Sequence, residues 1–256
     1  MASQLDCAGV SFADALVNHG DETCQVASPA VENRRRIVLA FVGMSFEARI
    51  AAGPGVQVVG RRAERELATI VRSAVQQGYR GMISFGVAGG LTSNLRAGDW
   101  VVASAVVEAQ NVRATDAAWS GKLLGMIAGA VYAPIVGVDT PVAEVAKKRE
   151  LHRVTGAAAV DMESHVVARL AAAHGLAFAA VRVVVDPADR ELPPAALLGM
   201  RPDGRADISA VLRDLMTRPS QLTPLARIAV DAFAARAAML RVRRLLGPHF
   251  GLADLA

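Results

Sequence analysis

The segment spanning residues 159–189 constrains the fold most, because it places an arginine inside an apolar strand. The run AFAAVRVVVD at residues 177–186 is rich in valine and indicates a buried strand. A buried guanidinium is costly unless a carboxylate pairs with it, so we expect Arg182 to point at an acid such as Glu163. Asp186 stands where the strand ends, and α/β folds usually bind their ligands at that edge.

Two acids, Asp161 and Glu163, precede a segment whose apolar residues recur at helical spacing and which ends at Gly175. Carboxylates beside a helix N-terminus complement the helix dipole by about 0.3–1 kcal/mol each, so capping alone would explain both acids. Arg182 favours a functional role for Glu163, which it would fix in place. For Asp161 the pattern indicates capping.

The rest of the chain alternates strands with helices between residues 37 and 186, which predicts an α/β fold with helices on both faces of a sheet. Apolar runs predict strands at residues 37–44, 56–59, 82–87, 100–107, 131–138 and 177–186. Helical spacing predicts helices at residues 45–50, 61–77, 119–130 and 143–154, and a loop at 108–118. Residues 1–35 form an expected N-terminal extension, and 36–256 an expected single domain with a helical tail, interrupted near Pro219 and Pro224.

Charge and composition exclude some classes of protein. The 28 basic and 24 acidic residues give a net charge of only +4, and aromatic residues make up 4%, which argues against a base-stacking surface for nucleic acid. Cys7 and Cys24 have no neighbours at metal-ligand spacing and indicate free thiols. The absence of an export signal or a long apolar run predicts a cytoplasmic protein.

A basic amphipathic segment, ARAAMLRVRRLL, lies near the C-terminus. Such a helix can rest on the anionic inner face of a membrane as a peripheral contact, but docking on the sheet is the commoner role for this pattern. We therefore expect docking and keep membrane contact as the alternative.

Two further features lie at strand ends. Glu47 follows the first predicted strand, and Gly89 and Gly90 follow the third. Adjacent glycines permit either a close approach of the backbone to a ligand or a tight turn with positive φ, and the sequence does not separate these. The spacing of Gly86, Gly89 and Gly90 is not that of a dinucleotide fingerprint.

The chain resembles the superfamily of purine nucleoside phosphorylases and methylthioadenosine/adenosylhomocysteine nucleosidases. The resemblance rests on Glu47, on GVAGGL, on VDMES and on VRVVVDPAD, in that order. The tail, with DPADRELPPAAL and RPDGRADISAVL, resembles the hopanoid-associated phosphorylases of bacteria. The resemblance implies a three-layer αβα fold with a mixed, partly barrel-like sheet, a homo-oligomer, and removal of adenine from adenosylhopane. It implies no cofactor and no metal, with inorganic phosphate as co-substrate if the reaction is phosphorolysis.

Residue by residue, the resemblance assigns roles. Met162 and Glu163 match the ribose-binding pair, Arg182 matches the arginine that orients Glu163, and Asp186 matches the acid that protonates purine N7. Val87, Ala88 and Gly89 would contact the substrate, although relatives often carry a serine in place of Val87. The nucleosidases also carry a serine where this chain has Val185.

The sequence leaves two candidates for the nucleophile, with phosphate placed first on the resemblance and water second on the residues. Phosphorolysis follows from the hopanoid branch, with Ser45, Arg49, Gly89 and Gly90 around phosphate. Hydrolysis follows from Glu47, which matches the glutamate that activates water in the nucleosidases. A third hypothesis is a purine-nucleoside binding module without catalysis. For a lipid-linked nucleoside, residues 193–198 or the C-terminal helix would line an apolar exit.

Overall fold

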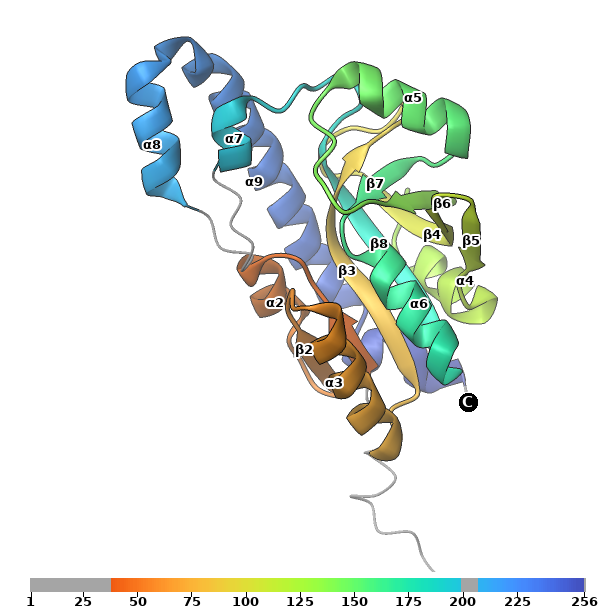
Figure 1. Cartoon of the computed structure of the whole chain (residues 1–256). Coiled ribbons are helices and arrows are strands. Elements are labelled where there is room, and N and C mark those ends of the chain that lie inside the picture. The colour runs from red at the N-terminus through yellow and green to blue at the C-terminus, as the bar shows by residue number, and fades with distance from the viewer. Residues whose placement is uncertain (1–37, 199–206, 256) are drawn as a thin grey trace, which may run out of the picture.

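The computed structural model describes residues 38–198 and 207–255 of the chain (Figure 1). The expected N-terminal extension, with Cys7 and Cys24, lies outside these residues, so that assignment and the domain boundary at residue 36 stay predictions.

A mixed eight-stranded sheet forms the centre of the molecule, in the order β2-β1-β3-β7-β6-β4-β5, and β8 joins β3 to β4. The strands are β1 (Val38–Phe41), β2 (Val56–Val59), β3 (Gly81–Gly90), β4 (Trp100–Glu108), β5 (Asn111–Ala114), β6 (Val131–Gly137), β7 (Ala159–Asp161) and β8 (Ala177–Asp186). Because β8 runs parallel to β3 and antiparallel to β4, the strands β3, β7, β6, β4 and β8 close into a ring. The predicted α/β class with a mixed, barrel-like sheet is confirmed.

Helices cover the sheet from both sides (Figure 1). One side carries α3 (Glu64–Gln76) and α6 (Ser164–His174), and the other carries α2 (Ser45–Ala51), α4 (Ala117–Met126) and α9 (Leu222–Leu245). The remaining helices are α5 (Val145–Thr155), α7 (Pro194–Leu198), α8 (Ile208–Thr217) and the 3-10 turns η1 (Pro219–Gln221) and η2 (Pro248–Leu255). None of the helices within residues 38–198 and 207–255 is both long and apolar enough to cross a bilayer.

The alternation of side chains along β8 determines where its arginine points. Val181 and Val183 pack into the core beneath α4 and α9, whereas Ala180 and Val184 pack into the core beneath α3 and α6. Successive side chains of a strand face opposite sides, so Arg182 faces the α6 side. The two acids of the predicted acidic turn are placed at the end of β7, where Asp161 stands, and directly before α6, where Glu163 stands, which explains why a charged residue fits in this strand.

The C-terminal helix docks on the sheet, as expected. Ala238, Val242 and Leu246 are buried in the core of the α9 side. The chain then turns back, and the indole N–H of Trp119 donates to the carbonyl oxygen of Phe250 at 2.8 Å. In this part of α9 the apolar side chains, which would otherwise face a membrane, thus pack against the sheet.

Two local predictions, those for residues 108–118 and for Pro224, were wrong, and one of the two alternatives left open for Gly89 and Gly90 is excluded. Residues 111–114 of the predicted loop form β5, which pairs with the end of β4. Gly89 and Gly90 are not a turn, because both belong to β3, which shifts its register against β8 between Ala88 and Gly89. Pro224 does not interrupt the tail, since it lies in the first turn of α9, where proline needs no hydrogen-bond partner for its nitrogen.

Candidate active site

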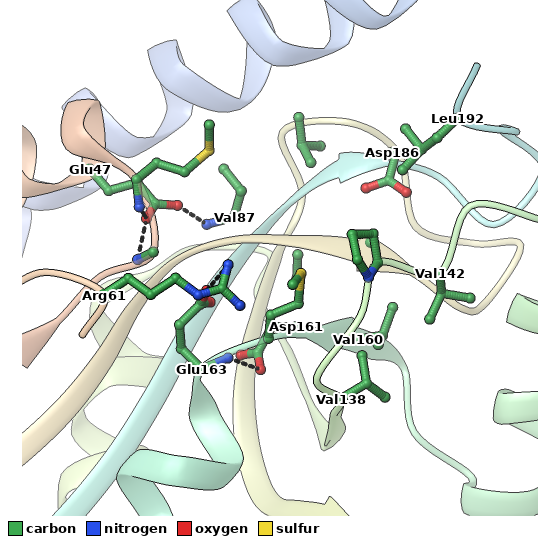
Figure 2. Close-up of a pocket in the computed structure, with 17 residues that line it drawn as sticks. Glu47, Arg61, Val87, Val138, Val142, Val160, Asp161, Glu163, Asp186 and Leu192 are labelled. Atoms are coloured by element: carbon green, nitrogen blue, oxygen red, sulfur yellow. Dashed lines mark hydrogen bonds and ion pairs between the residues drawn. The ribbon is translucent and has the colours of Figure 1, made fainter. Parts of the chain in front are cut away.

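A pocket opens where β1, β3, β7 and β8 end, and α9 passes above it (Figure 2). The space between its lining residues is about 780 Å³, a figure that includes the open, solvent-filled mouth. The polar side chains of its lining are mostly carboxylates, and the rest is largely apolar. The lining consists of Gly43, Met44, Glu47, Arg61, Val87, Ala88, Gly89, Val138, Pro141, Val142, Val160, Asp161, Met162, Glu163, Val185, Asp186 and Leu192.

Glu47 forms one side of the pocket and is held by backbone N–H groups. It lies in the first turn of α2 and folds back, so that one carboxylate oxygen accepts from Gly43 at 2.8 Å and from Met44 at 2.7 Å. The other oxygen accepts from the N–H of Val87 in β3 at 2.7 Å. Burial raises the pKa of Glu47 to about 7, although Arg182 opposes this rise. Glu47 therefore exchanges a proton near neutral pH.

Gly86 makes this approach of α2 to β3 sterically feasible. A Cβ atom at that position would lie 2.5 Å from Oε1 of Glu47 and 2.7 Å from Nη1 of Arg182. Both distances are shorter than real contacts allow. Gly86 of the GVAGGL motif thus bears on the site together with Gly89, which lines the pocket, although the sequence pattern assigned no role to Gly86.

Arg182 is fully buried behind the pocket and pairs with two acids. Its Nε atom lies 2.6 Å from Oδ2 of Asp161, and Nη2 lies 3.5 Å from Oε2 of Glu163. Nη2 also donates to the hydroxyl of Ser84 at 2.5 Å. The expected partner, Glu163, is therefore the more distant of the two. Asp161 lies nearer to Arg182 because it ends β7, a strand of the same sheet as β8.

Asp161 also caps α6, as the sequence predicted. Its Oδ1 accepts from the N–H of Glu163 at 3.3 Å and from that of Ser164 at 3.0 Å, and its Oδ2 accepts from the Ser164 hydroxyl. These bonds satisfy N–H groups that the start of the helix leaves without partners. One carboxylate thus connects the helix start to the buried arginine, a role that capping alone does not describe.

Glu163 faces the pocket from the start of α6 (Figure 2). Arg61, which also lines the pocket, lies 3.9 Å from it on the open side. Burial raises the pKa of Glu163, while Arg182 opposes the rise. A carboxylate placed between a buried and a half-exposed cation is well suited to bind hydroxyl groups.

Asp186 lies at the end of β8, across the pocket from Glu47 (Figure 2). Only 6% of the residue is exposed, and its Oδ2 lies 2.6 Å from Nζ of Lys148, a lysine of α5 with no exposed surface. Burial raises the pKa of Asp186, and Lys148 acts against this. The sequence analysis missed Lys148. A signal existed, because Lys148 stands three residues from both Val145 and Leu151, on the face of α5 that packs inward.

The other predicted site residues divide into two groups. Met162, Val87, Ala88 and Gly89 line the pocket. Arg182 lies beneath its floor, while the predicted phosphate ligands Ser45, Arg49 and Gly90 are not part of the lining, and Arg49 is exposed on α2. Arg61 is the cation that lines the pocket, and no pattern in the sequence pointed to it. Among residues 38–198 and 207–255, no group of three His, Cys, Asp or Glu side chains is arranged to hold a metal ion.

This arrangement suits acid and base chemistry on a bound small molecule. Two buried carboxyl groups, Glu47 and Asp186, face each other across the pocket, and both have raised pKa values. A third, Glu163, lies between two cations. Carboxyl groups on opposite sides of a scissile bond to a sugar are the usual means of glycoside cleavage.

Comparison with known proteins agrees with the fold. The sequence profile described as the phosphorylase superfamily matches residues 34–217. No curated protein matches the chain. The chain is similar to Helicobacter pylori 5′-methylthioadenosine/S-adenosylhomocysteine nucleosidase, with 18% identity over 70% of this chain and 97% of that chain, and a TM-score of 0.52.

Two more solved structures share the architecture. H. pylori futalosine hydrolase is 16% identical over 86% of this chain and 97% of its own, with a TM-score of 0.56. Schistosoma mansoni purine nucleoside phosphorylase is 14% identical over 61% of this chain and 87% of its own, with a TM-score of 0.51. At these identities the likeness shows the fold alone.

Proposed function

The chain belongs to the phosphorylase superfamily, and from that membership we propose that it cleaves the N-glycosidic bond of a purine nucleoside. The observation that carries the proposal is the placement of three buried or half-buried carboxylates, Glu47, Glu163 and Asp186, around one pocket. A module that only bound a nucleoside would have no need for acids with raised pKa values. The geometry therefore supports an enzyme over a binding module.

The proposed steps assign one task to each acid. As the bond from C1′ to N9 breaks, its electron pair passes to the purine, and Asp186 gives a proton to N7 so that a neutral base departs. Positive charge develops on the sugar, and the carboxylate of Glu163, fixed by Arg182, stabilises it while binding the hydroxyls. Glu47 takes a proton from water as the water oxygen attacks C1′.

We infer water as the nucleophile ahead of phosphate. Glu47 is anchored by three N–H groups, and its pKa of about 7 suits a general base at neutral pH. Ser45 and Arg49, the residues expected to bind phosphate, are not part of the pocket lining. Phosphorolysis, which the resemblance of the sequence placed first, becomes the second candidate, because Arg61 and the backbone at Gly89 line the pocket and could hold an anion.

One assay tests the reaction and its nucleophile together. Purine release from adenosylhopane and from 5′-methylthioadenosine is measured with and without inorganic phosphate. Release at an equal rate without phosphate, with the 5′-substituted ribose as an unphosphorylated product, supports hydrolysis. Release that requires phosphate and yields a sugar 1-phosphate identifies phosphorolysis, and no release from any purine nucleoside would contradict the proposal.

We propose a lipid-linked nucleoside, adenosylhopane, as the substrate, on the resemblance of the tail and on the apolar lining. Leu192 lines the pocket, and α7 follows it directly, with Leu198 exposed at its end. An apolar tail at the 5′ carbon would leave along this segment. If 5′-methylthioadenosine is turned over with the same kcat/KM as adenosylhopane, the lipid-specific part of the proposal fails.

We also propose that α9 brings the enzyme to an anionic bilayer, and that the chain forms a homo-oligomer like its superfamily. Leu222, Val230 and Phe233 are more than 60% exposed on one face of the N-terminal half of α9, beside Arg236. Apolar residues flanked by arginine are typical of helices that rest on anionic lipid. Binding to phosphatidylserine vesicles should weaken in Phe233→Glu and not in Glu66→Gln, an exposed change on α3, and equal binding would exclude this face.

A further inference from the structure

Lys148 has a polar environment built for a charged ammonium. Besides Asp186 Oδ2 at 2.6 Å, its Nζ atom donates to the carbonyl oxygens of Asp186 at 3.3 Å, Pro187 at 3.0 Å and Arg190 at 2.9 Å. An ammonium has three N–H donors and no acceptor, and all four of its neighbours are acceptors. These contacts therefore suit a charged Lys148 side chain, although the residue has no exposed surface.

Two opposing influences act on Asp186. Burial disfavours its carboxylate and raises its pKa, whereas the ammonium of Lys148 favours the carboxylate and lowers that pKa. The lysine thus makes Asp186 a stronger acid than burial alone would. The other charged groups near the pair are Asp231 of α9, which also raises the pKa of Asp186, and Arg190, which lies 3.1 Å from Asp231.

We propose that Lys148 is a positioning residue for the reaction, which holds Asp186 by Oδ2, presents Oδ1 to the purine and stabilises the carboxylate that proton transfer creates. This inference rests on the proposed function. Before transfer the lysine faces a neutral carboxylic acid, and after transfer it faces a full negative charge. Their attraction is therefore stronger at the transition state than in the bound substrate, which is the condition for a catalytic effect.

The test replaces Lys148 by methionine and uses its exposed neighbour in the same helix, Lys147→Met, as the matched control. We expect kcat for purine release to fall about tenfold to a hundredfold in Lys148→Met with KM within about threefold, less than the factor of about 10²–10⁴ of a general acid. The pH above which kcat declines should move upward, because the loss of a positive charge raises the pKa of Asp186. Lys147→Met should match the wild type in both respects.

A second readout does not depend on turnover. Infrared titration of the carboxyl band that Asp186→Asn removes reports the pKa of Asp186 directly. This pKa should rise in Lys148→Met and stay constant in Lys147→Met. An unchanged value would overturn the proposal and leave Lys148 as a clamp between α5 and β8. If Lys148→Met does not fold, Lys148→Gln, which keeps two N–H donors without the charge, takes its place.

A double-mutant cycle separates the two roles of Lys148. If the lysine acts through Asp186, then adding Lys148→Met to Asp186→Asn should cause no further loss of kcat. An independent loss of the same size would contradict the proposal. Failure of the wild-type enzyme to release any purine would contradict the proposed function instead, while the infrared result would still report on the pair.

Discussion

Each end of the pocket has a buried cation, and the two ends differ in the number of carboxyl groups that lie near this cation. At one end Lys148 forms an ion pair with Asp186 at 2.6 Å. At the other, Arg182 lies 2.6 Å from Asp161 and 3.5 Å from Glu163, and its charge also lowers the pKa of Glu47. The first, balanced end has one buried cation for one carboxyl group, whereas the second, crowded end has three carboxyl groups for the buried Arg182 and the more exposed Arg61.

This difference accounts for the opposite proton transfers that we propose for the two ends. Glu163 raises the pKa of Glu47, because a second negative charge nearby makes ionisation harder. The crowded end therefore binds and releases a proton near pH 7, as a base in turnover must. At the balanced end, in the proposed mechanism, the lysine stabilises the carboxylate that results when Asp186 has acted as an acid. Each prediction below alters the charge balance at one end.

Removing the acid of the balanced end should have the largest effect. In Asp186→Asn we expect kcat for purine release to fall by about 10²–10⁴, because the base must leave without a proton, while affinity for substrate stays within about tenfold. Steady-state kinetics and calorimetric binding measure the two quantities. Asp189→Asn, a change at an exposed acid three residues away, serves as the control. Unchanged turnover in Asp186→Asn would refute the assigned mechanism.

Removing the cation of the crowded end should reduce stability more than any surface change. Arg182→Met leaves Asp161 and Glu163 without their buried partner, and loss of one member of a buried pair typically costs about 3–5 kcal/mol of unfolding free energy. Urea unfolding measures this loss. The exposed pair of Arg153 and Glu150 offers the contrast, and Arg153→Met should change the unfolding curve little. Similar unfolding curves for both variants would show that the buried arginine contributes no more to stability than the exposed one.

The sequence predicted the acids better than it predicted their partners. Glu47 and Asp186 each follow an apolar run and Glu163 precedes a helix, and an α/β fold brings such positions to one edge. That reasoning uses only local pattern and fold class. It also located Arg182, because a charge in an apolar strand is conspicuous.

The partners depend on the register between elements far apart in the sequence. Asp161 and Glu163 are two residues apart, and only the pairing of β7 in the sheet decides which of them lies nearer to Arg182. Lys148 is 38 residues from Asp186, in a helix whose sequence KKRE resembles a solvated surface. Likewise β5 is a short strand of mostly exposed residues, without the apolar run that marked the others.

The pH dependence of stability should reveal the proton held at the crowded end. Glu47 has a pKa of about 7 in the folded protein against 4.5 as its ordinary value, so the folded state binds more protons between these values. Its contribution to stability is therefore complete below pH 4.5, falls as pH rises, and is lost above about 7. Across this window the wild type should lose about 3 kcal/mol relative to Glu47→Gln. Urea unfolding measures the free energy of unfolding of both proteins as a function of pH. If the two curves ran parallel between pH 4.5 and 7, they would contradict the assigned pKa of Glu47.

The smallest expected effect tests whether the crowding itself sets the pKa of Glu47. Glu163→Gln removes a negative charge that raises this pKa, and it leaves the contacts of Glu47 with Gly43, Met44 and Val87 in place. The midpoint of the Glu47 titration, followed by the same unfolding measurements, should therefore move below pH 7 by a fraction of a unit. Glu66→Gln, an exposed change on α3, should leave the midpoint unchanged. Desolvation is the larger cause of the raised pKa, so the midpoint should stay well above 4.5. A midpoint that did not move would mean that burial alone raises the pKa of Glu47. The contrast in charge between the crowded end and the balanced end would then have no part in making Glu47 a base.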